Sequence, residues 1–416
     1  MLNMIVGILF SRVLGPIGMG QYEIFRSTAV ITVTVMALGI GNANIFFLNN
    51  RKVLPTIITT NTVKIATVLG GILVAGLMTV ILAFPNYFGS ISILTALFFT
   101  SGVSALLSTL LLRPILVAQL AARKIVSTDL INRVVVLIVG TVLVITNWLS
   151  PEAAIFALAL GYFSSFLLVM GYLQPYIELT RPFEWRLLRS VITYGMKLAS
   201  SNLLYVLSCN ITVILLRLLS EEGFSDVGLY ARAVALCGLV SLLPIQIGPL
   251  LYAKWSNIKK EETRIHQAEM TIRVNLAYSL VVCIGVLVLG KYVICIMYGS
   301  EFIPATAALQ ILAPTMLFTP QFGVCNNLFA SDGRVGITVW IMIGMVIIIG
   351  SVSYLAIPTM GIRGAALGAF CGNAFTAIVS MTVCTRIYGL HLIRCLLLRK
   401  SDFSYIRQAL IHKKSV

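Results

Sequence analysis

Seven positively charged side chains lie within the long apolar segments of this 416-residue chain. If these segments cross a membrane, each charge near a helix centre costs about 2.5–3.5 kcal/mol and needs a reason. Arg offers forked donors that fit phosphate oxygens, and Lys offers a compact positive charge. Because we expect no Asp or Glu beside them at depth, the set indicates a path for an anion. Its members are Arg26, Lys64, Arg113, Lys197, Arg217, Arg232 and Lys291.

The seven cations divide into two groups by their place along the segments. Three lie toward the inner ends, namely Lys64, Arg113 and Lys197. Four lie toward the outer ends, namely Arg26, Arg217, Arg232 and Lys291. All are within a few turns of a segment end, so the alternative is that their side chains snorkel to lipid headgroups and that Arg217 pairs with Glu221. Both interpretations stay open.

Other kinds of chemistry find little support. The eight Cys lie mostly in apolar segments without a C-x-x-C pair, and the three His all lie in polar segments. We therefore expect no metal site, no disulfide framework, no cofactor and no Ser-His-Asp chemistry. The glycines at 15, 18 and 20 superficially resemble a nucleotide loop, but no strand precedes them and no Lys-Ser/Thr follows. With Pro16 they indicate an outward corner between two spans.

The amino-acid composition indicates that the apolar segments lie in a lipid bilayer. Hydrophobic residues make up 59% of the chain and charged residues 11%, and the mean hydropathy is +0.98. Soluble domains carry about one quarter charged residues. A bilayer core of about 30 Å needs roughly 20 apolar residues per helix. Eleven windows qualify: 24–48, 63–84, 91–118, 134–149, 152–173, 195–219, 227–252, 273–297, 303–329, 335–357 and 362–387.

The first ten residues form an apolar segment that is too short to cross a bilayer. As a helix they would rise about 15 Å, which is half of the hydrocarbon core. They lack the basic start and the cleavage site of a signal peptide. We therefore expect an incomplete first helix, with its remainder encoded upstream. The predicted fold is an all-α polytopic membrane protein of about twelve transmembrane helices.

Charge in the connections predicts the orientation, because short loops rich in Lys and Arg stay in the cytoplasm. The alternate connections, such as "FPNYFGS" and "SEEGFSDVG", are neutral or acidic and should face outward. Both termini are then cytoplasmic. Most of the net charge of +16 is explained in this way, so we expect no nucleic acid partner. The cationic inner positions are Arg51, Lys52, Arg123, Lys124, Arg133, Arg181, Arg186, Arg189, Lys254, Lys259, Lys260, Arg264 and Arg334.

Two short motifs recur at half the chain length. "MGQY" holds Gly20 and "VGLY" holds Gly228, 208 residues later, while "AAIFALALG" from Ala153 is matched by "AALGAFCG" from Ala365, 212 residues later. The agreement predicts two six-helix halves of the same orientation around a central cavity, as in transporters that rock one half against the other. The predicted parts are an N-terminal half, a cytoplasmic linker, a C-terminal half and a basic tail on the membrane: 1–175, 176–194, 195–388 and 389–416.

Four segments carry a family resemblance. They are "SRVLGPIGMGQY" from Ser11, "DVGLYARA" from Asp226, "YGSEFIPATAALQIL" from Tyr298 and "GIRGAALG" from Gly361. Together they resemble the oligosaccharide flippases of the polysaccharide biosynthesis family, within the multidrug, oligosaccharidyl-lipid and polysaccharide exporter superfamily.

The resemblance implies that undecaprenyl-pyrophosphate-linked repeat units move from the inner to the outer leaflet of the cytoplasmic membrane. The repeats would build O-antigen, capsule or exopolysaccharide, and a polymerase and a chain-length regulator would act next. The cations would then meet the pyrophosphate. Amides within the spans would bind the sugars, namely Asn202, Asn210, Asn326, Asn327 and Asn373.

Two other functions were weighed. A cation-coupled multidrug exporter of the same superfamily would be expected to hold a carboxylate inside the membrane, and the sequence shows none at depth. A membrane polymerase or ligase would be expected to carry its catalytic groups on a long outer loop, and the outward connections are short. Both are therefore less favoured, and we expect a transporter rather than an enzyme.

Overall fold

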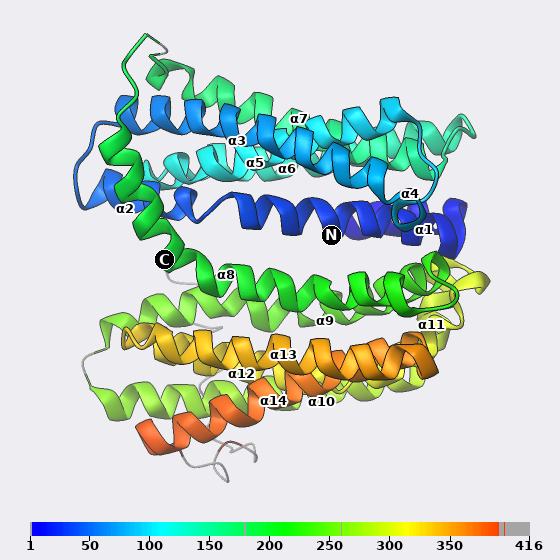
Figure 1. Cartoon of the computed structure of the whole chain (residues 1–416). Helices are drawn as coiled ribbons and strands as arrows, with labels where there is room; N and C mark the ends of the chain where they lie inside the picture. The colour runs from blue at the N-terminus through cyan, green and yellow to red at the C-terminus, as the bar shows by residue number, and fades with distance from the viewer. Residues whose placement is uncertain (1, 179, 259, 391–394, 396–416) are drawn as a thin grey trace, which may run out of the picture. The chain divides into compact units, whose positions relative to one another are not determined.

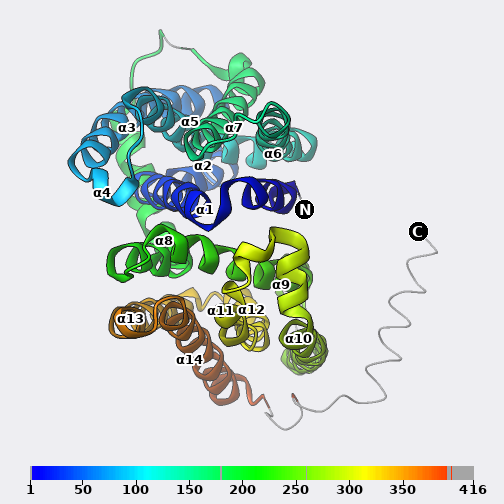
Figure 2. The same cartoon turned by 90° about the vertical axis from the view of Figure 1, so that its right-hand side faces the viewer.

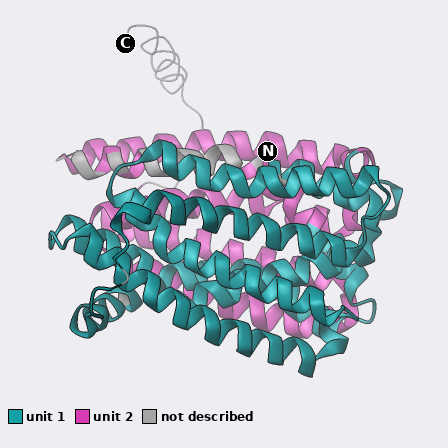
Figure 3. Cartoon of the chain, turned by 90° about the horizontal axis from the view of Figure 1, so that it is seen from above, with its two compact units in different colours: residues 1–231, 297–302 teal, residues 232–296, 303–416 magenta. Residues whose placement is uncertain are grey.

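The computed structural model describes residues 2–178, 180–258, 260–390 and 395, and every regular element in those ranges is helical (Figure 1). The chain forms two compact units, shown in Figure 3. One is Met1–Ala231 with Met297–Phe302, and the other is Arg232–Ile296 with Ile303–Val416. The division of the chain into sequence halves at 176–194 stays a prediction, and the predicted tail lies almost wholly outside the described residues.

The first unit is built around four long helices that lie side by side (Figures 1 and 2). One buried cluster is formed by aliphatic side chains of α3, α5 and α7, among them Ile58, Ile115 and Val169. The four helices are α3 (Pro55–Ala83), α5 (Ile93–Ala118), α6 (Ala122–Ile145) and α7 (Pro151–Leu173). The other elements are α1 (Leu2–Met36), α2 (Ile40–Asn49), α4 (Pro85–Phe88), η1 (Gln174–Tyr176), α8 (Trp185–Leu219), the start of α9 (Phe224–Asn257) and η2 (Ser300–Phe302).

Helix α1 bends at the predicted corner. Gly15 has φ 63° and ψ −174°, a conformation that L side chains rarely adopt, and Pro16 follows it. A second break, which the sequence did not predict, separates α1 from α2 at residues 37–39. There Gly39 crosses Gly195 of α8, and a Cβ on Gly39 would lie 2.1 Å from the Gly195 carbonyl oxygen. The predicted span 24–48 is therefore two helices rather than one.

The connection that follows α7 is bound along the start of α3. The Glu178 backbone N–H donates to the Thr60 hydroxyl at 3.0 Å, and the Glu184 N–H donates to the Asn61 side-chain oxygen at 3.2 Å. Thr60 and Asn61 are both buried. These polar side chains thus supply hydrogen-bond partners to backbone groups of this connection.

The second unit contains the rest of α9 and five further helices. They are α10 (Glu261–Tyr298), α11 (Ala305–Leu312), α12 (Thr315–Ser331), α13 (Val335–Met360) and α14 (Ile362–Tyr388). The helices α13 and α14 pack closely, because Gly364 and Gly368 leave room for the α13 backbone and for Ser353. A buried cluster around Trp255, Ile272 and Phe329 joins α9, α10 and α12.

The helices have the length and composition of membrane spans. Within the described residues nine helices qualify, or ten if α11 and α12, which are bent by 43°, form one span. The prediction of about twelve counted α1 as two segments, and it counted α9, in which many side chains lie outside the described residues. These two cases account for the difference. Large apolar side chains such as Leu94 and Val281 are exposed, as expected for surfaces that meet lipid. The chain is a multi-pass all-α membrane protein.

Candidate functional site

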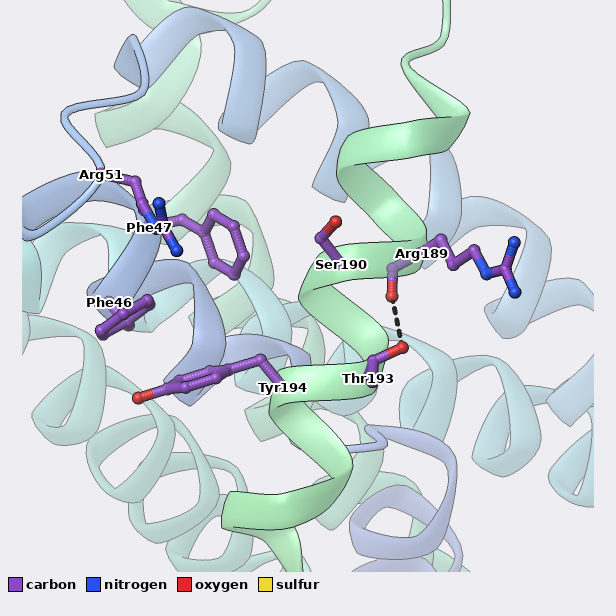
Figure 4. Close-up of a pocket in the computed structure, with 7 residues that line it drawn as sticks. All are labelled: Phe46, Phe47, Arg51, Arg189, Ser190, Thr193 and Tyr194. Carbon is purple, nitrogen blue, oxygen red and sulfur yellow. Dashed lines mark hydrogen bonds between the residues drawn. The ribbon is translucent and has the colours of Figure 1, made fainter.

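A cavity of about 390 Å³ opens between the end of α2 and the first turns of α8 (Figure 4). Both helices belong to the first unit. We call it the aromatic pocket, and it is lined by Phe46, Phe47, Arg51, Arg189, Ser190, Thr193 and Tyr194.

Three rings form the wall of the aromatic pocket. Phe46 and Tyr194 are stacked, with ring centroids 4.3 Å apart and planes at 22°. Phe47 meets Tyr194 edge-on, at 6.2 Å and 90°. Figure 4 shows the Arg51 side chain beside Phe47, whereas the Arg189 side chain points away from the rings. The pocket therefore offers one guanidinium next to an aromatic surface, a combination suited to a phosphate joined to a ring-shaped group.

The sequence did not predict this pocket. Its two arginines were assigned to inner connections on charge alone, and nothing in the spacing places residues 46–51 next to 189–194. The signal was indirect: two segments rich in aromatic and basic residues were predicted to lie at the same side of the membrane.

The predicted inner cations have partners of their own. Lys64 Nζ donates to the Arg181 carbonyl at 2.6 Å, and Arg181 Nη1 donates to the Thr56 hydroxyl at 3.3 Å, so both add to the bonds between α3 and the connection after α7. Arg113 Nη2 on α5 forms an ion pair with Asp129 on α6 at 2.5 Å. The side chain of Lys197 lies outside the described residues.

Arg26, one of the predicted outer cations, also has a carboxylate partner. Its Nε lies 2.6 Å from Glu23 Oε2, one turn earlier on α1. The Glu23 side chain is only 3% exposed, whereas that of Arg26 is 49% exposed. The expectation that no Asp or Glu accompanies these cations is therefore wrong, both here and at Arg113.

Arg217 binds backbone oxygens, whereas the alternative considered from the sequence was a pair with Glu221. Its Nε donates to the Tyr87 carbonyl at 2.9 Å, and its Nη2 donates to the Asn86 carbonyl. Its guanidinium also lies 3.8 Å from the ring centroid of Phe224. Burial raises the pKa of Tyr87 to about 12 against the opposing charge of Arg217, so this phenol stays neutral. The four groups form one contact cluster in the first unit.

The remaining predicted residues lie in different surroundings. Arg232 on α9 is buried, at 5% exposure, and Lys291 on α10 is exposed. Asn210 on α8 donates to the Val206 carbonyl of its own helix at 2.8 Å. Their role in a substrate path stays a prediction. Within the described ranges no group of three or more His, Cys, Asp or Glu is placed to hold a metal ion.

The other predicted amides have protein partners where the structure records them. Asn326 Oδ1 accepts from Thr338 at 2.7 Å, and Asn373 Oδ1 accepts from Thr319 at 3.2 Å. These bonds join α12 to α13 and to α14. Such amides stabilise helix packing whether or not they also meet a ligand.

The helical layout has the fold of solved transporters of the MOP superfamily. An inward-facing multidrug resistance MATE family transporter aligns with a TM-score of 0.76 at 16% identity, covering 93% of this chain and 94% of that one. The lipid II flippase MurJ in an inward closed conformation aligns with a TM-score of 0.72 at 12% identity, covering 100% of this chain and 90% of that one. A MOP superfamily transporter from Pyrococcus furiosus, described as having reverse polarity of its binding pocket, gives 0.66 at 16% identity, covering 93% and 91%.

The family follows from the sequence itself. Residues 9–307 match the family described as polysaccharide biosynthesis protein, so the chain belongs to that family. A search of curated proteins gave no match. The resemblance expected from the four sequence motifs is confirmed, and the relatives are transporters and flippases rather than enzymes.

Proposed function

We propose that this protein flips undecaprenyl-pyrophosphate-linked oligosaccharide repeat units from the inner to the outer leaflet of the cytoplasmic membrane. The repeats serve O-antigen, capsule or exopolysaccharide assembly, and a polymerase and a chain-length regulator receive them. Membership in the polysaccharide biosynthesis family supports this proposal, as does the shared fold with a lipid II flippase.

The geometric observation that carries the proposal is the aromatic pocket. A lipid-linked sugar presents a pyrophosphate and then a saccharide, so it needs a cation next to a flat apolar surface. Arg51 lines the same pocket as the stacked rings of Phe46 and Tyr194, and it lies in a connection whose charge predicts an inner location. In this proposal the pocket receives the head group before it enters the path between the halves.

Of the cations predicted for that path, Arg232 and Lys291 belong to the second unit. Arg232 is buried on α9 and also has a partner within the protein, and Lys291 is exposed on α10. Lys64, Arg113, Arg26 and Arg217 each already bind a protein oxygen, so any contact with cargo competes with those bonds.

A multidrug exporter is the second candidate, and one observation favours it. Glu23 on α1 and Glu269 on α10 are buried carboxylates, which the sequence argument against an exporter had excluded. Proton or Na⁺ coupling uses such groups. The Glu23 carboxylate already pairs with Arg26 at 2.6 Å. Because the family is one of polysaccharide biosynthesis, flipping is the preferred function.

The test combines a deletion strain with variants of the aromatic pocket. Loss of the protein should cause lipid-linked repeats to accumulate on the inner face, and Arg51→Gln should reproduce much of that defect at matched abundance. One bidentate phosphate contact corresponds to roughly 10- to 100-fold in apparent affinity. Lys52→Gln, next in sequence and outside the pocket lining, is the matched control and should transport normally.

Other outcomes would change the assignment. If repeats accumulate on the outer face, a step after flipping is impaired instead. If the deletion leaves lipid-linked repeats unchanged and increases sensitivity to cationic drugs, the multidrug exporter is the better assignment.

A further inference from the structure

Two arginines on separate helices reach backbone carbonyls far away in the sequence. Arg217 at the end of α8 donates to the carbonyls of Asn86 and Tyr87. Arg12 on α1 donates through Nε to the Met297 carbonyl at 3.2 Å, a bond between residues 285 positions apart. All of these residues belong to the unit formed by Met1–Ala231 with Met297–Phe302. The bonds help to explain why the short segment 297–302 belongs to that unit.

The two contacts are counterparts in the internal repeat. Arg12 lies eight residues before Gly20 of "MGQY", and Arg217 lies eleven before Gly228 of "VGLY". Their acceptors are also alike, because one lies in "NYFGS" after α3 and the other in "MYGSE" at the end of α10. Each arginine thus reaches from one predicted half to the matching connection of the other.

The repeat motifs themselves touch. A Cβ on Gly20 would lie 1.8 Å from the Phe224 carbonyl oxygen, and a Cβ on Gly228 would lie 2.0 Å from the Pro16 carbonyl oxygen. Only glycine permits backbones to approach so closely. Since Gly20 and Gly228 are equivalent in the repeat, an axis relating the halves would pass through this crossing. The Arg12 and Arg217 contacts would then be related to each other by the same axis.

We propose that the Arg12 and Arg217 contacts form a reciprocal latch that holds the predicted outer helix ends together and opens once in each transport cycle. This rests on the proposed function only in requiring alternating access between two halves. The acceptors of Arg217 in this latch are neutral backbone carbonyls.

The contacts beneath Arg217 show what the latch covers. The Phe224 ring lies under the guanidinium at 3.8 Å. A Cβ on Gly89 would meet both that ring, at 3.2 Å, and the Gln21 amide nitrogen, at 2.8 Å. Gln21 in turn donates to the Phe88 carbonyl at 3.1 Å. Release of Arg217 would free this loop and expose Gln21.

Accessibility of a cysteine at position 21 tests the latch. The background carries Gln21→Cys with the exposed Cys209 and Cys295 replaced by Ser, and the probe is a membrane-impermeant maleimide added outside intact cells. Labelling needs no cargo. The latch and the choice of substrate are therefore tested independently, and either can fail while the other stands.

Latch variants should increase the labelling rate. One charge-assisted hydrogen bond corresponds to roughly tenfold in an equilibrium constant. We therefore expect about tenfold faster labelling for Arg12→Gln and for Arg217→Gln, and about 100-fold for the pair. Arg217→Lys should be intermediate, because it keeps the charge and loses the fork. Arg363→Gln, an exposed arginine at the start of α14, is the control and should leave the rate unchanged.

A second measurement keeps the proposal testable if Arg217→Gln does not fold. Cysteines at 84 and 218, which line one cavity with Arg217 and leave that arginine in place, should stop transport when joined by a short reducible crosslinker, and reduction should restore it. Unchanged labelling in the folded double variant would overturn the latch, as would normal transport by the crosslinked protein.

Discussion

Substitution of Arg26 should destabilise the protein more than substitution of its ion-pair partner Glu23. The Glu23 side chain is 3% exposed and that of Arg26 is 49% exposed, with 2.6 Å between Nε and Oε2. Arg26→Met leaves a buried carboxylate without its cation, a change that costs about 3–5 kcal/mol when both partners are buried. Because Arg26 is half exposed and its charge is screened, the lower end applies, about 3 kcal/mol.

The partner substitutions should cost less. Glu23→Gln removes the charge but keeps the shape and one hydrogen bond acceptor, so we expect about 1 kcal/mol. The double variant Glu23→Leu with Arg26→Met replaces the pair by apolar groups and should lie within about 1 kcal/mol of the wild type. The double-mutant cycle therefore predicts strong coupling between the two positions.

Equilibrium unfolding of the purified protein in mixed micelles measures these differences. A loss of about 3 kcal/mol changes the ratio of folded to unfolded protein by roughly 150-fold. Equal and additive effects of the two single variants would refute the reasoning, because a buried carboxylate cannot lose its cation without extra cost. Transport at matched abundance gives a second measurement: if Arg26 also meets the pyrophosphate, Arg26→Met should slow release while Glu23→Gln does not.

Three further predictions concern packing, the connection after α7 and orientation. Gly228→Ala should destabilise by about 1–3 kcal/mol because its methyl group would overlap an α1 carbonyl, whereas Gly238→Ala on the same helix meets nothing within 4 Å and should be harmless in the same unfolding assay. Lys64→Met should make the 176–184 connection more susceptible to limited proteolysis, and unchanged cleavage would contradict its anchoring role. A cysteine at Glu222 should react with an impermeant reagent from outside while one in the α9–α10 connection should not, and the reverse pattern would invert the proposed direction of transport.

Apolar length made most of the helices predictable. The segment 362–387 is α14 (Ile362–Tyr388), and 91–118 contains α5 (Ile93–Ala118), because a bilayer demands a long uninterrupted apolar run. Helix α8 begins at Trp185 instead of the predicted 195, since its first turns carry Arg186 and Arg189 and look like a charged loop. The break at 37–39 depends on a glycine crossing with another helix, which no local pattern reveals.

The candidate site was predictable only in part. Residue type identified the cations, but their partners are carbonyls or carboxylates on distant elements, such as Arg181 for Lys64 and Asp129 for Arg113. Glu23 was visible in the sequence, three residues before Arg26 and on the same helix face, but it was not counted as a partner of that cation. Sequence spacing predicts which side chains are neighbours on one helix, but it does not predict contacts between different helices.

The bonds between α3 and the connection after α7 affect how the protein is made. Thr60 and the Glu178 N–H are 118 residues apart in the chain. At about 5–20 residues per second, the ribosome reaches Glu178 roughly 6–24 s after Thr60. Thr60 and Asn61 are buried in the folded protein. During that interval their side chains lack the backbone partners at Glu178 and Glu184. The hydrogen bonds between α3 and the connection after α7 can thus form only when synthesis of α8 begins. The folding of the helices α3, α5, α6 and α7 therefore depends on a segment that is translated after them.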